Sequence, residues 1–109
     1  MKLKKEKVLS VLHEFHGKLA AMYGKRLKGV YLYGSYARED AREDSDIDVA
    51  VVLSDIASRW EEREKIGDIT ADLSLRENCL LTAFVMSEAE LRERPYAIHR
   101  SIEREGIAV

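Results

Sequence analysis

The stretch GSYAREDAREDSDID, residues 34–48, decides the fold that we expect for this chain. It opens on Gly34-Ser35 and closes on two acids, Asp46 and Asp48. The residues on either side, 29–33 and 46–53, are rich in strand-forming side chains. They predict two strands that are neighbours in one antiparallel pair, with the Gly34 turn beside the two acids.

The two acids of this stretch predict a cation site. Side chains two apart on a strand share a face, which places the Cβ atoms of Asp46 and Asp48 roughly 6–7 Å apart. Mg²⁺ prefers such hard oxygen ligands and completes its shell with water and substrate phosphates. Two close carboxylates also repel each other, and a bound cation relieves that repulsion. We therefore expect Asp46 and Asp48 to be metal ligands and catalytic residues.

The glycine-serine turn predicts a phosphate site next to that cation. Backbone N–H groups at such a turn, together with the Ser35 hydroxyl, can hold phosphate oxygens, and Gly34 permits close approach. Arg38 and Arg42 lie in the intervening segment and suit bidentate contacts with further phosphate charge. Gly-Ser or Asp-x-Asp alone is common in ordinary turns. The combination, with a strand on each side, favours a site for a metal-bound triphosphate.

The rest of the chain predicts a single domain of the α/β (α+β) class. Residues 34–45 should form a short helix or an ordered loop, and the last helix should stop at Gly106. Because a long helix joins the second and third strands, they should be parallel, with helices largely on one face of a small mixed sheet. Helices are expected at 4–23, at 56–77, from Ser87 to before Pro95 and at 96–105, and the third strand is expected at 80–86.

Bulk composition narrows the range of partners and locations. The 109 residues suffice for one core, and the net charge of −2 gives no basis for wrapping a nucleic-acid backbone. The single cysteine, Cys79, cannot form an internal disulfide, which fits a reducing compartment. No apolar run has the length of a signal peptide or membrane span. A cytoplasmic protein without membrane attachment is expected.

Several side chains are expected to have structural roles only. His13, His16 and His99 form no metal-ligand spacing with any acid and are interpreted as surface or helix-packing residues. Trp60 is expected to anchor the long helix in the core, or otherwise to cap an exposed patch.

The motif Tyr33-Gly34-Ser35-Tyr36-Ala37-Arg38, followed by residues 45–51, closely resembles the minimal nucleotidyltransferases of the DNA polymerase beta superfamily. The resemblance implies a nucleotidyltransferase fold and transfer of a nucleoside monophosphate, usually AMP from ATP, to a hydroxyl. It also implies that Asp46 and Asp48 hold Mg²⁺ and that Gly34-Ser35 holds the triphosphate.

The same resemblance implies a partner, because such proteins often accompany a small helical HEPN protein in toxin–antitoxin pairs. Our first hypothesis is an adenylyltransferase that modifies a hydroxyl of this partner, as the antitoxin half. The second is a non-catalytic module that neutralises the partner by binding, because strand 80–86 lacks the superfamily's third carboxylate. Glu77 and Glu88 flank that strand and are poor substitutes. The short chain leaves the acceptor to be supplied by a partner or by a second copy.

Overall fold

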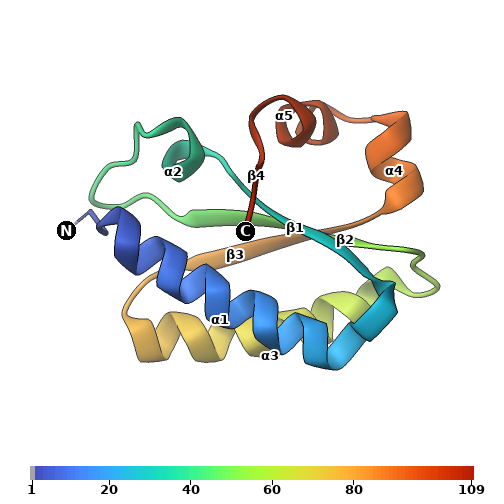
Figure 1. Cartoon of the computed structure of the whole chain (residues 1–109), viewed down its shortest axis with the longest axis horizontal. Helices are drawn as coiled ribbons and strands as arrows, with labels where there is room; N and C mark the ends of the chain where they lie inside the picture. The colour runs from blue at the N-terminus through green and yellow to red at the C-terminus, as the bar shows by residue number, and fades with distance from the viewer. Residues whose placement is uncertain (1) are drawn as a thin grey trace.

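Three layers make up the fold, with a four-stranded sheet between two sets of helices (Figure 1). The computed structural model describes residues 2–109. Its elements are α1 (Lys5–Tyr23), the 3-10 turn η1 (Gly24–Arg26), β1 (Leu27–Tyr33), α2 (Ser35–Arg38), β2 (Ile47–Leu53), α3 (Arg59–Glu77), β3 (Leu81–Ser87), α4 (Glu88–Glu93), α5 (Ala97–Glu105) and β4 (Ile107–Ala108). Within this described part, none of the helices combines the length and apolarity that crossing a bilayer requires.

The strands lie in the order β3-β2-β1-β4. β1 and β2 are antiparallel, and β2 and β3 are parallel, which confirms the predicted mixed sheet. The short strand β4 was not predicted. It pairs Ile107 with Leu32 and Ala108 with Tyr31, and two residues are too few to carry a sequence period.

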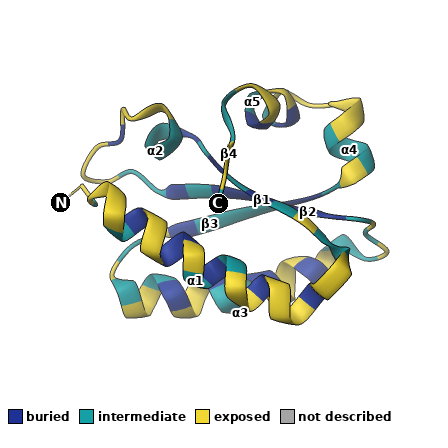
Figure 2. Ribbon diagram, viewed as in Figure 1, coloured by how far each residue is buried: buried dark blue, intermediate teal, exposed yellow. Residues whose placement is uncertain are grey.

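The two long helices, α1 and α3, cover one face of the sheet, and α4 and α5 cover the other, so the helices are not confined largely to one face as predicted. Strand residues at alternate positions point toward α1 and α3, among them Val30, Ile47 and Val49. The intervening residues of β2, Ala50 and Val52, point to the opposite face. There they pack with residues of β3, α4 and α5. Figure 2 shows the resulting buried stripes, and because both faces are covered, β2 is the central strand of the core.

Helix caps correct one boundary and confirm another. α3 begins at Arg59, three residues later than predicted, because the Ser58 side chain accepts a hydrogen bond from the Glu61 N–H and caps the helix there. The predicted capping box at α4 is present. The Glu90 N–H donates to Ser87 Oγ at 3.1 Å, and the Ser87 N–H donates to Glu90 Oε1 at 3.0 Å.

The expected core role of Trp60 is wrong, since 68% of this residue is exposed. The buried side of α3 instead contains Glu62, Ile66 and Leu73, and the position of Trp60 lies off that stripe. His99 in α5 is fully buried and packs edge-on against Phe84.

Candidate functional site

The site is built where the end of β1 meets the beginning of β2. Tyr33, the last residue of β1, pairs with Asp48 across the antiparallel ladder. Gly34 follows in a left-handed conformation, with φ of +77°. A Cβ atom at this position would overlap the Asp48 carboxylate at Oδ2. The turn and the acid are therefore in direct contact, and both the backbone angle and the space require glycine.

Thr82 of β3 holds the Asp48 carboxylate from the opposite side. The parallel register places Thr82 level with Asp48, and the Thr82 hydroxyl donates to Asp48 Oδ1 at 2.8 Å. This leaves Oδ2 directed toward Gly34. Sequence reasoning did not identify Thr82, because the register of the parallel pair is set across the intervening helix α3 and no local pattern fixes it.

Asp48 lies in an environment that disfavours its charge. Burial raises the pKa of its carboxyl, the Thr82 hydrogen bond lowers it, the negative charge of Asp46 raises it and Arg38 lowers it, with a net rise. Burial, helped by the Asp48 charge, also raises the pKa of Tyr33 to about 12. Two half-buried carboxylates that disfavour each other's negative charge suit a divalent cation. The carboxylate oxygens of Asp46 and Asp48 are therefore ligands that fit Mg²⁺.

Asp46 stands one residue before β2 and is half-buried. Its negative charge raises the pKa of the Asp48 carboxyl. It also lines a cavity of about 190 Å³ together with Tyr36 and Cys79. Asp46 therefore borders a small cavity that Asp48 does not line.

Of the residues predicted to contact phosphate, Gly34, Ser35 and Arg38 lie at or near the turn beside Asp48. The N–H groups of Ala37 and Arg38 donate to the Gly34 carbonyl at 3.1 and 3.0 Å, so the N–H groups of Ser35 and Tyr36 precede the first helical bond of α2. Arg38 lies near enough to influence the pKa of Asp48. Its guanidinium pairs with Asp40 at 3.2 Å and with Glu105 at 3.1 Å.

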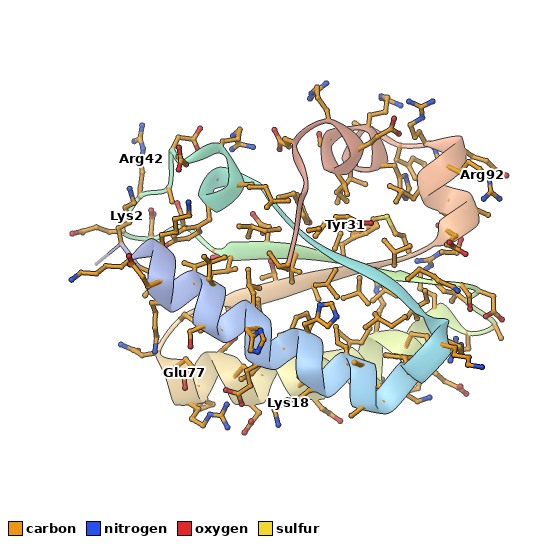
Figure 3. The ribbon with its side chains drawn as sticks, in the orientation of Figure 1. Lys2, Lys18, Tyr31, Arg42, Glu77 and Arg92 are labelled. Carbon is orange, nitrogen blue, oxygen red and sulfur yellow. The ribbon has the colours of Figure 1, made fainter. Side chains whose placement is uncertain are left out.

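Arg42 is not brought to this cluster. Its N–H donates to Ser45 Oγ at 2.8 Å, which shapes the loop. The side chain is exposed and lies on the outer part of the loop between α2 and β2 (Figure 3).

Among the described residues, no third acid joins Asp46 and Asp48 in a metal-binding group. Within residues 2–109 there is no group of three His, Cys, Asp or Glu side chains that could hold a metal ion. Glu77 forms an ion pair with Lys7 at 2.5 Å. Glu88 is the first residue of α4 and follows the end of β3, whereas Thr82 lies near the start of that strand. Neither acid lies beside Asp48.

A turn of glycine and serine against a spaced carboxylate pair, carried on a mixed sheet, is the arrangement of a nucleotide-transferring domain. The family described as Polymerase beta, Nucleotidyltransferase matches residues 18–109. The chain belongs to this family, which confirms the resemblance drawn from its motifs.

Named relatives support the same assignment. The chain is 32% identical to Putative protein adenylyltransferase MJ0604 of Methanocaldococcus jannaschii over 96 residues, covering 87% of this chain and 90% of that protein. It is 33% identical to Protein adenylyltransferase MntA of Thermococcus cleftensis over 94 residues, covering 84% and 93%. A crystal structure of a toxin–antitoxin with AMP-PNP shares the fold, with a TM-score of 0.60 at 19% identity, covering 97% of this chain and 72% of that one.

Proposed function

We propose that this chain transfers AMP from Mg²⁺-ATP to a hydroxyl of a partner protein. The observation that carries this proposal is the direct contact between the Gly34 turn and the Asp48 carboxylate. A triphosphate held at the turn would lie against a cation held by Asp46 and Asp48. The relatives named protein adenylyltransferase support AMP as the transferred group and a protein as its acceptor.

Each site residue has a distinct role in this proposal. Asp46 and Asp48 hold Mg²⁺, which when bound neutralises charge on the phosphates and orients them. The N–H groups of Ser35 and Tyr36 at the start of α2, with the Ser35 hydroxyl, bind phosphate oxygens. Arg38, half-exposed and close to Asp48, adds a guanidinium to the same phosphates. Arg42 contributes only if its loop closes over the nucleotide.

We propose further that the chain is the antitoxin half of a cytoplasmic toxin–antitoxin pair whose other half is a small helical HEPN-type protein. The toxin–antitoxin structure that shares this fold, and contains AMP-PNP, supports both the partner and the nucleotide. A single Cys79 fits a reducing compartment.

A second function is favoured by a specific observation, the absence of a third acid beside Asp48 among residues 2–109. In the superfamily that acid serves the attacking hydroxyl, and here Thr82 stands level with Asp48 instead. A chain of this kind would bind the nucleotide and the partner without transferring AMP. It would then neutralise the partner by binding alone.

One experiment distinguishes the two functions. The chain is incubated with Mg²⁺, α-labelled ATP and the HEPN-type protein encoded beside it, and the label on that protein is measured. The Asp46→Asn/Asp48→Asn double variant should lose labelling, whereas Asp68→Asn, an exposed acid of α3, should retain it. If wild type leaves the partner unlabelled, and the double variant still binds it, the transferase function is wrong and the binding function stands.

A further inference from the structure

The outer edge of β3 has no neighbouring strand within residues 2–109. The Ile47 N–H donates to the Leu80 carbonyl at 2.8 Å, so Leu80 and every second residue after it direct their backbone groups toward β2. Ala83 and Val85 therefore direct theirs outward. Val85 demonstrates this direction, because its carbonyl accepts a hydrogen bond from Arg59 Nη1 at 2.6 Å.

Ala83 is left with an outward N–H and carbonyl that face no other strand of the described chain. Ala83 is only half-buried, so another chain can reach these groups. An unpaired backbone of this kind is the template on which an extended peptide adds as a further strand.

A positively charged cavity of about 220 Å³ lies on the same edge. It is lined by Arg59, Arg63, Ala83, Phe84, Val85, Glu90, Tyr96 and His99. The one acid, Glu90, is already paired with Arg59 at 2.5 Å. Arg63 is exposed and forms no ion pair with any residue in 2–109. The cavity thus retains one uncompensated guanidinium.

His99, one of the residues that line this cavity, has a hydrogen-bond donor without a partner. Its Nδ1 accepts from the Tyr96 N–H at 3.3 Å, which assigns the ring proton to Nε2. Nε2 is buried and has no hydrogen-bond partner within the described residues. A buried donor without a partner costs about 1–3 kcal/mol. An acceptor oxygen that entered from the cavity would relieve that cost.

Two exposed aromatic residues belong to the cavity or are adjacent in sequence to a residue that lines it. Tyr96, which lines the cavity, is 66% exposed, and Trp60, which follows Arg59 in the first turn of α3, is 68% exposed. Tyrosine, tryptophan and arginine are the residues that dominate the binding energy of protein–protein interfaces. Tyr96 and the two arginines of the cavity therefore favour a protein ligand.

We propose that the free edge of β3 docks an extended acidic segment of a partner protein. The segment pairs with Ala83 as an added strand and places a carboxylate against Arg63 and the Nε2–H of His99. Ala83 directly follows Thr82, which binds Asp48, so the docked segment lies one strand away from Asp48, with β3 between them. The docking does not depend on the proposed function. Only the further statement that this segment carries the acceptor hydroxyl rests on it.

The test uses the full chain, without nucleotide, and a blocked hexapeptide of alternating glutamate and valine. Trp60 is the only tryptophan, so its fluorescence reports binding, and amide exchange reports protection of the Ala83 N–H. We expect saturable binding and a protected Ala83 amide. Arg63→Glu should weaken binding about tenfold. Arg92→Glu changes net charge equally but lies at the outer side of α4 (Figure 3), and should leave binding unchanged.

Three results would overturn the docking surface. The first is the absence of saturable binding, and the second is equal affinity for the hexapeptide with lysine in place of glutamate. The third is displacement of the peptide by an equimolar ten-nucleotide polyuridine, which would assign the surface to nucleic acid. Because no ATP is present, a chain that binds the peptide but never labels a partner loses only the proposed transfer.

Discussion

The Thr82 hydroxyl donates a hydrogen bond of 2.8 Å to Oδ1 of Asp48, across the parallel pair β2 and β3. This bond uses one carboxylate oxygen and leaves the other facing the Gly34 turn. Thr82 therefore fixes the orientation in which Asp48 is presented to a cation.

Removing this hydroxyl should weaken cation binding. Thr82→Val keeps the shape of the side chain but frees the carboxylate to rotate and loses a bond to a charged group, which is worth about 1.5–3 kcal/mol. We expect Mn²⁺, used as a probe for Mg²⁺, to bind about tenfold more weakly. The free ion is measured by electron paramagnetic resonance during titration.

Two variants control this measurement. Thr82→Ser retains the hydroxyl and should restore most of the affinity. Thr70→Val removes a hydroxyl of α3 that bonds only the Gly67 carbonyl, and should leave Mn²⁺ binding unchanged. Equal affinities for wild type and Thr82→Val would show that Asp48 needs no such positioning.

Asp48 should make the metal-free protein less stable at neutral pH. Burial raises the pKa of its carboxyl in the folded state, so the folded protein holds this proton more tightly than the unfolded chain. The resulting stability is present below the ordinary value of 3.8 and is lost as the pH rises through the raised folded value. We expect Asp48→Asn to raise the melting temperature at pH 7, without added metal.

The same thermal scans test the sign of this effect. Lowering the pH from 7 toward 4 should narrow the difference between wild type and Asp48→Asn, because Asp48 takes up its proton. Adding Mn²⁺ should stabilise wild type but not the variant. A variant that melts below wild type at pH 7 would contradict the expectation.

The parts of the fold that follow a repeating pattern were predictable from the sequence. Alternation along β2 separates Val49, which packs with the long helices, from Ala50, which lies on the opposite face, and the predicted placement of Asp48 beside the Gly34 turn agrees with the structure. The contact of Gly34 with Asp48 also follows from two adjacent antiparallel strands. Local patterns sufficed here because each of these contacts is set by neighbouring elements.

Features that depend on distant contacts were not predictable. Strand β4 has two residues and exists only because Ile107 and Ala108 meet β1. Trp60 has the large apolar side chain of a typical core residue. However, Ile66 and Leu73 determine which side of α3 faces the core, and Trp60 is not on that side. The role of Thr82 depends on register across a helix of 19 residues, which no local signal fixes.

Gly34→Ala should disable the site. A methyl group at this position overlaps the Asp48 carboxylate, and φ of +77° is unfavourable for alanine. Either the carboxylate or the turn must move, so Mn²⁺ and ATP should both bind at least tenfold more weakly. We expect a loss of stability of about 1–3 kcal/mol, since strained backbone costs of that order are typical. Calorimetric titration and chemical unfolding measure the two effects.

Gly17→Ala is the matched control for this variant. Gly17 lies within α1, and a Cβ atom there would meet nothing within 4 Å. Alanine should therefore stabilise the helix by about 0.5–1 kcal/mol and leave ligand binding unchanged. Similar losses of ATP affinity in both glycine variants would mean that the contact between Gly34 and Asp48 is not required.

The buried acid Glu62 should make the protein sensitive to alkali through Tyr23. The Tyr23 hydroxyl donates to Glu62 Oε1 at 3.1 Å, and Arg26 pairs with the other oxygen at 2.7 Å. Burial, followed by the bond to Glu62, raises the pKa of Tyr23 to about 12 from its ordinary 10.0. The stability linked to this proton is complete below pH 10 and is lost as the pH rises toward 12.

Tyr23→Phe removes both the proton and the bond. Chemical unfolding at pH 7 should show a loss of about 1 kcal/mol, the usual worth of such a hydrogen bond. Between pH 10 and 12 the variant should then lose stability less steeply than wild type, because no tyrosinate forms beside Glu62. Tyr33→Phe is the companion variant, since burial and Asp48 raise the pKa of Tyr33 to about 12 as well. If the Tyr23→Phe/Tyr33→Phe double variant loses stability between pH 10 and 12 as steeply as wild type, neither tyrosine is the source of the alkaline instability.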